Sequence, residues 1–476
     1  MLFNSLQFCL FFIVVSALYF LLPHKYRWFL LLLASCYFYM VFVPVYILIL
    51  GFTIVIDYFA GIFIEQSQGK KRKLYLTASL IANIGVLAVF KYYNFINDNI
   101  TVLLHGAGWT NPIPYLSILL PVGLSFHTFQ AMSYTIEVYR GNQPAERNFG
   151  IYSLYVMFYP QLVAGPIERP QNLLHQFYEK HSFDYHRVSE GLKMMLWGLF
   201  KKLVIADRLA IYVNSVYGYP DLHSGISLFI ATIFFSFQIY CDFSAYSEIA
   251  IGAAKVMGFK LMTNFNRPYF SKSIAEFWKR WHISLSTWFK DYLYISLGGN
   301  KVSIPRWYFN LFFVFLVSGL WHGANWTFII WGALNGFYLV AALITKPLTD
   351  KIGTVTGFSK ATKLNTFFQI LGTFILTSFA WIFFRANTVS DAFTIVKKIF
   401  TFKGPVFMDN MSAFIYCLLG ILFLLAYEFK KEYYRGSITI MNHQNRLVRH
   451  LAYAALILII LGFGVFDGGQ FIYFQF

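Results

Sequence analysis

The stretch YFNLFFVFLVSGLWHGANW, residues 308–326, contains no charged side chain other than the ionisable His322. A run of this length and apolarity crosses the hydrocarbon core of a bilayer as a helix, which needs ~20 residues. An ionisable side chain in such a run is costly to bury and is a functional candidate by default. The stretch therefore predicts a membrane helix that carries a site residue.

The same apolar character continues along the whole chain. Of 476 residues, 58% are hydrophobic and 12% are charged, against roughly a quarter charged in a soluble domain. Further apolar runs occupy residues 6–22, 74–90, 226–241, 367–384 and 451–466. We therefore expect an all-α polytopic membrane protein with about eleven transmembrane helices, forming one domain over residues 1–476. Asp242 and Glu248, which follow one of these runs, are expected to pair with Lys or Arg.

Positive charge is concentrated in one part of the chain. The net charge is +17, and nine Lys or Arg residues occur between Lys255 and Arg306 against two acids, Glu276 and Asp291. This density is typical of a cytoplasmic loop that contacts the anionic headgroups of the lipid bilayer. A docking surface for an anionic acyl donor is the alternative. Aromatic residues interleave the basic ones and no nucleic-acid module occurs, so we expect no nucleic-acid partner.

The cysteines and the short motifs of the chain give no sign of a metal or a bound cofactor. Cys9, Cys36, Cys241 and Cys417 lie far apart and form no CxxC pair. No phosphate-binding loop, dinucleotide fingerprint or HExxH helix occurs. We therefore predict no metal site and no resident cofactor.

Residues 274–292 predict an amphipathic helix that does not cross the membrane. Ser273 followed by Glu276 has the form of a capping box, so the helix is expected to begin near Ile274. Apolar side chains fall on one arc of this helix and polar ones lie opposite. His282 lies at the edge of the apolar arc, where it faces either a cavity or the headgroup boundary.

The surroundings of His322 favour a chemical role. A neutral imidazole, with an unperturbed pKa near 6.5, is suited to take a proton from a hydroxyl. Trp321 and Asn325 place hydrogen-bonding groups beside it. Seven of the eleven tryptophans fall within 54 residues, at positions 278, 281, 288, 307, 321, 326 and 331. Two interfacial aromatic belts and an aromatic-lined tunnel both account for this clustering.

Five motifs carry a resemblance to a known family. They are residues 122–141 (VGLSFHTFQAMSYTIEVYRG), 162–170 (LVAGPIERP), 238–252 (QIYCDFSAYSEIAIG), 264–300 (NFNRPYFSKSIAEFWKRWHISLSTWFKDYLYISLGGN) and 318–336 (SGLWHGANWTFIIWGALNG). With them the chain resembles the membrane-bound O-acyltransferases, in particular the bacterial alginate O-acetylase-like branch. The ending at residues 466–476 also favours that branch over the shorter D-alanyl transferases.

The resemblance implies an architecture and a site. The family fold is a ring of membrane helices around a thin waist, with a central tunnel and additional non-spanning helices. His322 matches the catalytic histidine, and His282 matches a second characteristic position that is asparagine in many eukaryotic members. Asn325, Trp321, Trp278 and Trp281 are then expected to bind the substrate.

The resemblance also implies an activity. It is the transfer of an acyl group, acetyl above all, from a cytoplasmic thioester across the membrane for O-acetylation of an extracytoplasmic, alginate-like polysaccharide. Acetyl-coenzyme A is the expected donor, an SGNH-type acetyltransferase the expected partner, and the bacterial plasma (inner) membrane the expected location. The alternatives are D-alanyl transfer from a carrier protein to teichoic acid and peptidoglycan O-acetylation. A transporter or a structural scaffold is disfavoured by the motifs.

Overall fold

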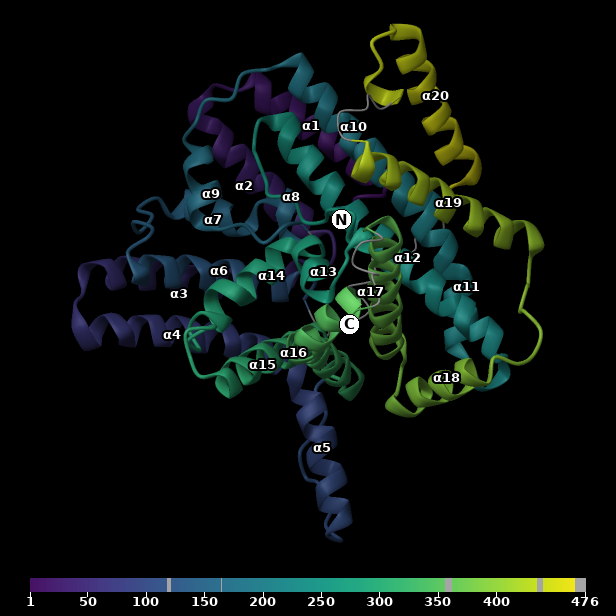
Figure 1. Ribbon diagram of the computed structural model, residues 1–476. Coiled ribbons are helices and arrows are strands. Elements are labelled where there is room, and N and C mark those ends of the chain that lie inside the picture. The colour runs from purple at the N-terminus through teal and green to yellow at the C-terminus, as the bar shows by residue number, and fades with distance from the viewer. Residues whose placement is uncertain (118–120, 164, 356–361, 435–439, 467–476) are drawn as a thin grey trace. The chain divides into compact units, whose positions relative to one another are not determined.

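The computed structural model describes residues 1–117, 121–163, 165–355, 362–434 and 440–466. These residues form helices joined by loops, without a β-strand among them (Figure 1). In this part of the chain, eight helical segments are long and apolar enough to cross a membrane. The prediction of an all-α polytopic membrane protein is thereby confirmed. Some apolar helices are shorter than such a span, for example α1 (Leu6–Leu21, 16 residues), so the count by length is below the expected number of about eleven.

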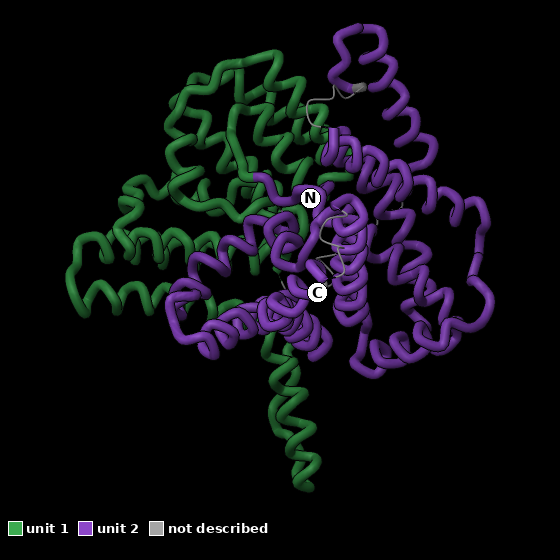
Figure 2. The backbone as a smooth tube through the Cα atoms, in the orientation of Figure 1, with its two compact units in different colours: residues 1–195, 246–262 green, residues 196–245, 263–476 purple. Residues whose placement is uncertain are grey.

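The chain divides into two compact units (Figure 2). The first comprises residues 1–195 and 246–262, and the second comprises residues 196–245 and 263–476. Helices α10 (Tyr185–Phe200) and α12 (Gly225–Met257) contribute residues to both units. The single domain expected over residues 1–476 stays a prediction. The C-terminal stretch at residues 466–476, which favoured one branch of the family, lies outside the described residues except for Phe466.

The first unit holds the N-terminal helices. After α1 these are α2 (His24–Met40), η1 (Pro44–Tyr46), α3 (Ile47–Gln66), α4 (Gly69–Leu87), η2 (Ala88–Tyr92), α5 (Tyr93–Gly106), α6 (Leu124–Arg140), α7 (Phe149–Met157), α8 (Tyr159–Leu162), α9 (Pro170–Leu173) and η3 (Leu174–Phe177). Asp57 of α3 is fully buried and accepts hydrogen bonds from Ser79 (2.6 Å) and Asn83 (2.9 Å) of α4. These bonds satisfy a buried carboxyl group that has no water to solvate it.

The second unit holds both predicted site histidines. Its elements are η4 (Lys201–Ala206), α11 (Asp207–Gly218), η5 (Pro220–Leu222), part of α12, η6 (Pro268–Phe270), α13 (Ile274–Arg280), α14 (Ile283–Phe289), η7 (Lys290–Tyr294), α15 (Ile304–His322), α16 (Trp326–Val355), α17 (Thr362–Arg385), α18 (Val389–Thr401), α19 (Met411–Tyr433), η9 (Ile440–Asn442) and α20 (Arg446–Phe463). Figure 1 shows α15 and α16 side by side.

A buried ion cluster fastens η4 and α11 to α12. The Lys202 ammonium lies 2.8 Å from a carboxylate oxygen of Asp207 and 2.6 Å from one of Asp242. All three side chains are buried. Such a cluster is tolerated in an apolar interior only because the charges are paired. The pairing expected for Asp242 is confirmed.

Glycines bring α15 and α16 into backbone contact. A Cβ at Gly319 would overlap the carbonyl oxygen of Phe328, and one at Gly332 would overlap that of Phe315. Small residues permit this approach between membrane helices, where dispersion contacts rather than the hydrophobic effect favour packing. The hairpin therefore holds the end of α15, which carries His322, close to the start of α16.

We expect Gly332→Ala to lower the thermal unfolding midpoint of the purified protein, because its methyl group meets rigid backbone at a cost of about 1–3 kcal/mol. The measurement is thermal denaturation in detergent, followed by tryptophan fluorescence. Gly372→Ala in α17 is the matched control, since a Cβ there meets nothing within 4 Å. An unchanged midpoint for Gly332→Ala would show that the α15–α16 contact is looser than described.

Candidate functional site

His322 lies in an enclosure of aromatic rings. It is the last residue of α15 and only 5% of its surface is exposed. Its ring centroid lies 4.9 Å from that of Trp321, 5.0 Å from that of Trp331 and 5.4 Å from that of Phe384. These rings come from α15, α16 and α17, so three helices fix the position of the imidazole.

Asn325 holds the turn that follows His322. Its side-chain oxygen accepts a hydrogen bond from the Thr327 backbone N–H (3.0 Å), and its amide nitrogen donates to the Asn387 carbonyl oxygen (3.2 Å). The first bond caps α16, and the second ties that helix to the residues after α17. The structure therefore gives Asn325 a positioning role beside His322, and its contact with substrate stays a prediction.

His282 lies at a break between two short helices, where a continuous amphipathic helix was expected over residues 274–292. α13 ends at Arg280, Trp281 is extended, and His282 has a left-handed backbone with φ of 42°. The expected helix continues as α14 on the far side of this turn. The spacing of apolar residues continues across the break, so the sequence pattern predicted one continuous helix there.

The His282 side chain forms the N-terminal cap of α14. Its Nδ1 accepts a hydrogen bond from the Leu285 backbone N–H at 3.3 Å. The imidazole is fully buried and packs edge-on against Phe243, with ring centroids 4.5 Å apart. Burial lowers the pKa of this imidazole from its ordinary 6.5 to about 3. The ring is therefore neutral, and because Nδ1 accepts, its hydrogen is on Nε2.

Asn264 braces this turn from a neighbouring segment. Its carbonyl oxygen accepts from the Ile283 N–H (2.9 Å), and its side-chain oxygen accepts from the N–H (3.2 Å) and the hydroxyl (2.9 Å) of Ser284. Asn264 is 1% exposed. Sequence reasoning did not single out Asn264, and the only signal was its place as the first residue of the motif at residues 264–300.

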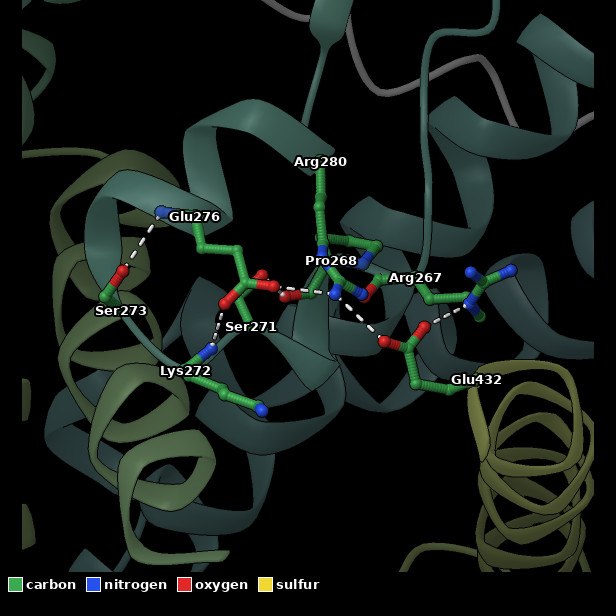
Figure 3. Close-up of polar contacts among 8 residues, drawn as sticks. All are labelled: Arg267, Pro268, Ser271, Lys272, Ser273, Glu276, Arg280 and Glu432. Atoms are coloured by element: carbon green, nitrogen blue, oxygen red, sulfur yellow. Dashed lines mark hydrogen bonds and ion pairs between the residues drawn. The ribbon is translucent and has the colours of Figure 1, made fainter. Parts of the chain in front are cut away.

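The start of α13 agrees with the predicted capping box. The Ser273 hydroxyl accepts from the Glu276 N–H at 3.2 Å, and α13 begins at Ile274 (Figure 3). The Glu276 carboxylate accepts from the Lys272 N–H (2.9 Å) instead of the Ser273 N–H of a full capping box. The first turn of α13 is thus fixed from both directions.

Two arginines clamp the same segment to α19 (Figure 3). The Glu432 carboxylate accepts from Arg267 at 2.6 Å and from Arg280 at 2.9 Å, and Arg280 also donates to Glu276 at 2.6 Å. Arg267 has a left-handed backbone, with φ of 46°. Shared, partly buried carboxylates hold guanidinium groups more firmly than isolated surface pairs do. The clamp fixes α13 immediately before the His282 turn.

A chain of aromatic rings joins the surroundings of the two histidines. Trp331, which contacts His322, stacks on Trp381 with centroids 5.7 Å apart and an angle of 18° between the rings. Trp381 in turn lies 5.1 Å from Trp281, the residue before His282. Trp281 is 1% exposed and therefore has a packing role here. Sequence reasoning missed Trp381, because only the fold brings α17 to this position.

Trp278 and Trp321 lie at other edges of this aromatic cluster. Trp278 packs against Trp331 with centroids 5.7 Å apart, and Trp321 contacts His322 directly. His322, His282 and the three predicted tryptophans thus belong to one unit and one continuous set of contacts. Their roles in catalysis and substrate binding stay predictions. Across the described ranges, no group of three or more His, Cys, Asp or Glu side chains is placed to hold a metal ion.

Comparisons with known proteins agree with the motifs. A family model for the membrane-bound O-acyltransferases matches residues 146–384, which include both histidines. The probable alginate O-acetylase of Azotobacter vinelandii is 37% identical over 431 residues, covering 90% of this chain and 83% of that protein. The peptidoglycan O-acetyltransferase of Helicobacter pylori is 35% identical over 79% of this chain and 74% of its own length. The teichoic acid D-alanyltransferase of Bacillus subtilis is 26% identical over 44% of this chain and 56% of its own length.

We expect Asn264→Ala to lower the free energy of unfolding by about 1–3 kcal/mol, because the buried Ser284 N–H loses its acceptor. Chemical or thermal denaturation in detergent measures the change. Asn266→Ala is the matched control, since this side chain is exposed and the residue contributes a backbone N–H to Arg280. Equal stability of the two variants would mean that Asn264 does not hold the turn.

The low pKa of His282 predicts a pH dependence of stability. The folded protein keeps this imidazole neutral while the unfolded chain protonates it, so its contribution is complete above about pH 6.5 and is lost as pH falls toward 3. Asparagine also caps helices and tolerates a left-handed backbone. As pH falls from about 7.5 to about 5, the free energy of unfolding of His282→Asn should therefore decrease less than that of the wild type. The difference is up to ~1.4 kcal/mol per pH unit. Thermal midpoints across this range test it, and parallel curves would count against a buried neutral His282.

Proposed function

The chain belongs to the membrane-bound O-acyltransferase family, and from this premise we propose that it transfers acetyl groups from a cytoplasmic thioester for O-acetylation of an extracytoplasmic, alginate-like polysaccharide. It is an O-acyltransferase and a multi-pass membrane protein. The observation that carries the proposal is the likeness to the probable alginate O-acetylase of Azotobacter vinelandii over 90% of this chain.

His322 is the general base of the proposed reaction. The oxygen of the acceptor hydroxyl attacks the thioester carbonyl carbon while a ring nitrogen of His322 takes the hydroxyl proton. The carbon–sulfur bond then breaks, and the proton passes to the thiolate, so the products are an ester and a thiol. The aromatic enclosure supports this role, because it keeps water away from a thioester that water would hydrolyse.

His282 has the chemistry of a hydrogen-bond donor. Its Nδ1 is already an acceptor within the fold, and its low pKa prevents it from acting as a base at neutral pH. In the proposed mechanism its Nε2–H stabilises the oxyanion that forms at the thioester carbonyl. Trp321, Trp278, Trp281 and Asn325 shape the enclosure in which the acyl group and the acceptor meet.

The proposal includes the donor, the partner and the location. Acetyl-coenzyme A is a substrate, and the net positive charge of the segment between Lys255 and Arg306 attracts its phosphates toward the protein. An SGNH-type acetyltransferase on the outer face completes transfer to the polymer. The bacterial plasma (inner) membrane is the location in which a cytoplasmic donor and an extracytoplasmic polymer are both within reach.

Peptidoglycan is the second candidate acceptor. The Helicobacter pylori relative, named for that activity, is 35% identical over 79% of this chain. D-alanyl transfer is less favoured, because the teichoic acid D-alanyltransferase of Streptococcus thermophilus is 29% identical over only 47% of this chain.

We expect His322→Ala to reduce acetyl transfer by at least about 100-fold, since a general base contributes about 10²–10⁴-fold. The measurement is transfer from radiolabelled acetyl-coenzyme A in membranes with matched expression, using alginate and peptidoglycan fragments as separate acceptors. His282→Ala should lose about 100-fold as an oxyanion donor. His105→Ala is the control, because this histidine of α5 is exposed.

The outcomes separate the parts of the proposal. Wild-type transfer by His322→Ala would refute its role as the base. If only peptidoglycan fragments are labelled, the proposed acceptor is peptidoglycan instead of the alginate-like polysaccharide. If the protein is active only with a D-alanyl carrier protein, the transferred group is D-alanyl instead of acetyl.

A further inference from the structure

A cavity opens in the second unit between α13–α14 and the hairpin of α15 and α16. Its volume is about 440 Å³, within the ~300–1,000 Å³ of small-molecule sites. Leu311, Val314 and Phe315 line it from α15, and Ile283 and Phe289 line it from α14. One wall therefore accepts a hydrocarbon chain.

Two lysines lie at this cavity without a counter-charge among the residues that the structure describes. Lys279 and Lys290 are exposed and line the same space. In contrast to Arg267 and Arg280, which share Glu432, neither forms an ion pair within the described residues. No acidic residue is among those that line the cavity in this part of the chain. The cavity thus combines an apolar wall with two unneutralised positive charges.

Two hydroxyls complete the polar end. Ser286 donates to the Trp281 carbonyl oxygen (3.2 Å) and Thr287 donates to that of Ile283 (2.8 Å). Their hydrogens are engaged, so toward a ligand in the cavity these oxygens act as acceptors. A ligand that suits all three parts has an anionic group, a hydroxyl-bearing head and an acyl chain.

We propose that this cavity binds an anionic phospholipid with a polyol headgroup. The phosphate lies between Lys279 and Lys290, a headgroup hydroxyl donates to Ser286 or Thr287, and the first part of an acyl chain follows α15. The bilayer around a multi-pass protein supplies such a molecule at high local concentration, and surface lysines attract anionic lipids. Coenzyme A also offers phosphates, but its pantetheine arm carries polar amides and suits an apolar wall less well than an acyl chain does.

The lipid would act on the site through direct contacts. Trp278 lines the cavity and packs on Trp331, which contacts His322. Ser318, one helical turn before His322, also lines it. A bound lipid therefore supports α13 against α15 where both approach the histidines. This inference does not depend on which acyl group or polymer the enzyme uses.

The test is lipid retention by the full-length protein. The protein is reconstituted in nanodiscs of phosphatidylcholine mixed with phosphatidylglycerol and extracted into mild detergent, and the retained phosphatidylglycerol is quantified by mass spectrometry. Lys279→Ala/Lys290→Ala should retain on the order of ten-fold less than the wild type, because each lysine near a headgroup contributes to anionic lipid binding. Lys272→Ala/Lys301→Ala is the matched control, since both lysines are exposed in the same basic segment and neither lines the cavity. It should retain the wild-type amount.

Two further arms decide the source of the anion and the place of binding. Excess coenzyme A should leave the retained lipid unchanged; if it displaces the lipid from the wild type, the cavity is a donor phosphate site and the proposal fails. Leu311→Trp fills the cavity and keeps both lysines, so it should also lose the lipid. Wild-type retention by either the double lysine variant or Leu311→Trp would overturn the proposal.

Discussion

The hydrogen bonds of Asn264 to residues 283 and 284 are the constraint on which the geometry of the second site histidine depends. A left-handed backbone at a residue other than glycine costs of order 1–3 kcal/mol and persists only where its surroundings over-determine it. Here the surroundings act from three sides. Asn264 holds the residues after His282, the Arg267–Glu432–Arg280 clamp holds those before it, and the histidine caps α14 itself.

His322 lies where helix packing and aromatic rings surround it. The backbone contact at Gly319 and Gly332 fixes the end of α15 against α16, and the rings of Trp331 and Phe384 contact the imidazole. Trp331 stacks on Trp381, and Trp381 contacts Trp281, so the packing around His322 continues to the residue before His282. Polar contacts thus fix the turn at His282 and aromatic surfaces surround His322, and neighbouring tryptophans connect the two regions.

Local features of the sequence predicted local features of the structure. Apolar length predicted the membrane helices, and the Ser273–Glu276 spacing predicted the start of α13. The helix expected over residues 308–326 ends at His322, and α16 begins at Trp326. The features that were missed all depend on distant segments. The break at Trp281–His282 leaves the apolar spacing intact, so periodicity does not reveal it. Asn264, Glu432 and Trp381 gain their roles from contacts between residues 19 to 165 positions apart in the sequence, which no short motif encodes.

The conformation of residue 282 limits which amino acids evolution can place there. A left-handed backbone with a side chain that must accept from the N–H three residues later leaves asparagine, aspartate and histidine as the suitable types, because β-branched and bulky apolar residues are strained there and cannot cap. Aspartate would bring a charge to a position where the side chain is fully buried. Histidine and asparagine remain, and these are the two residues that the family resemblance associates with this position. Their interchange preserves the turn and the cap, while it replaces an imidazole N–H with a shorter amide N–H and so alters how far the group reaches toward an acyl carbonyl.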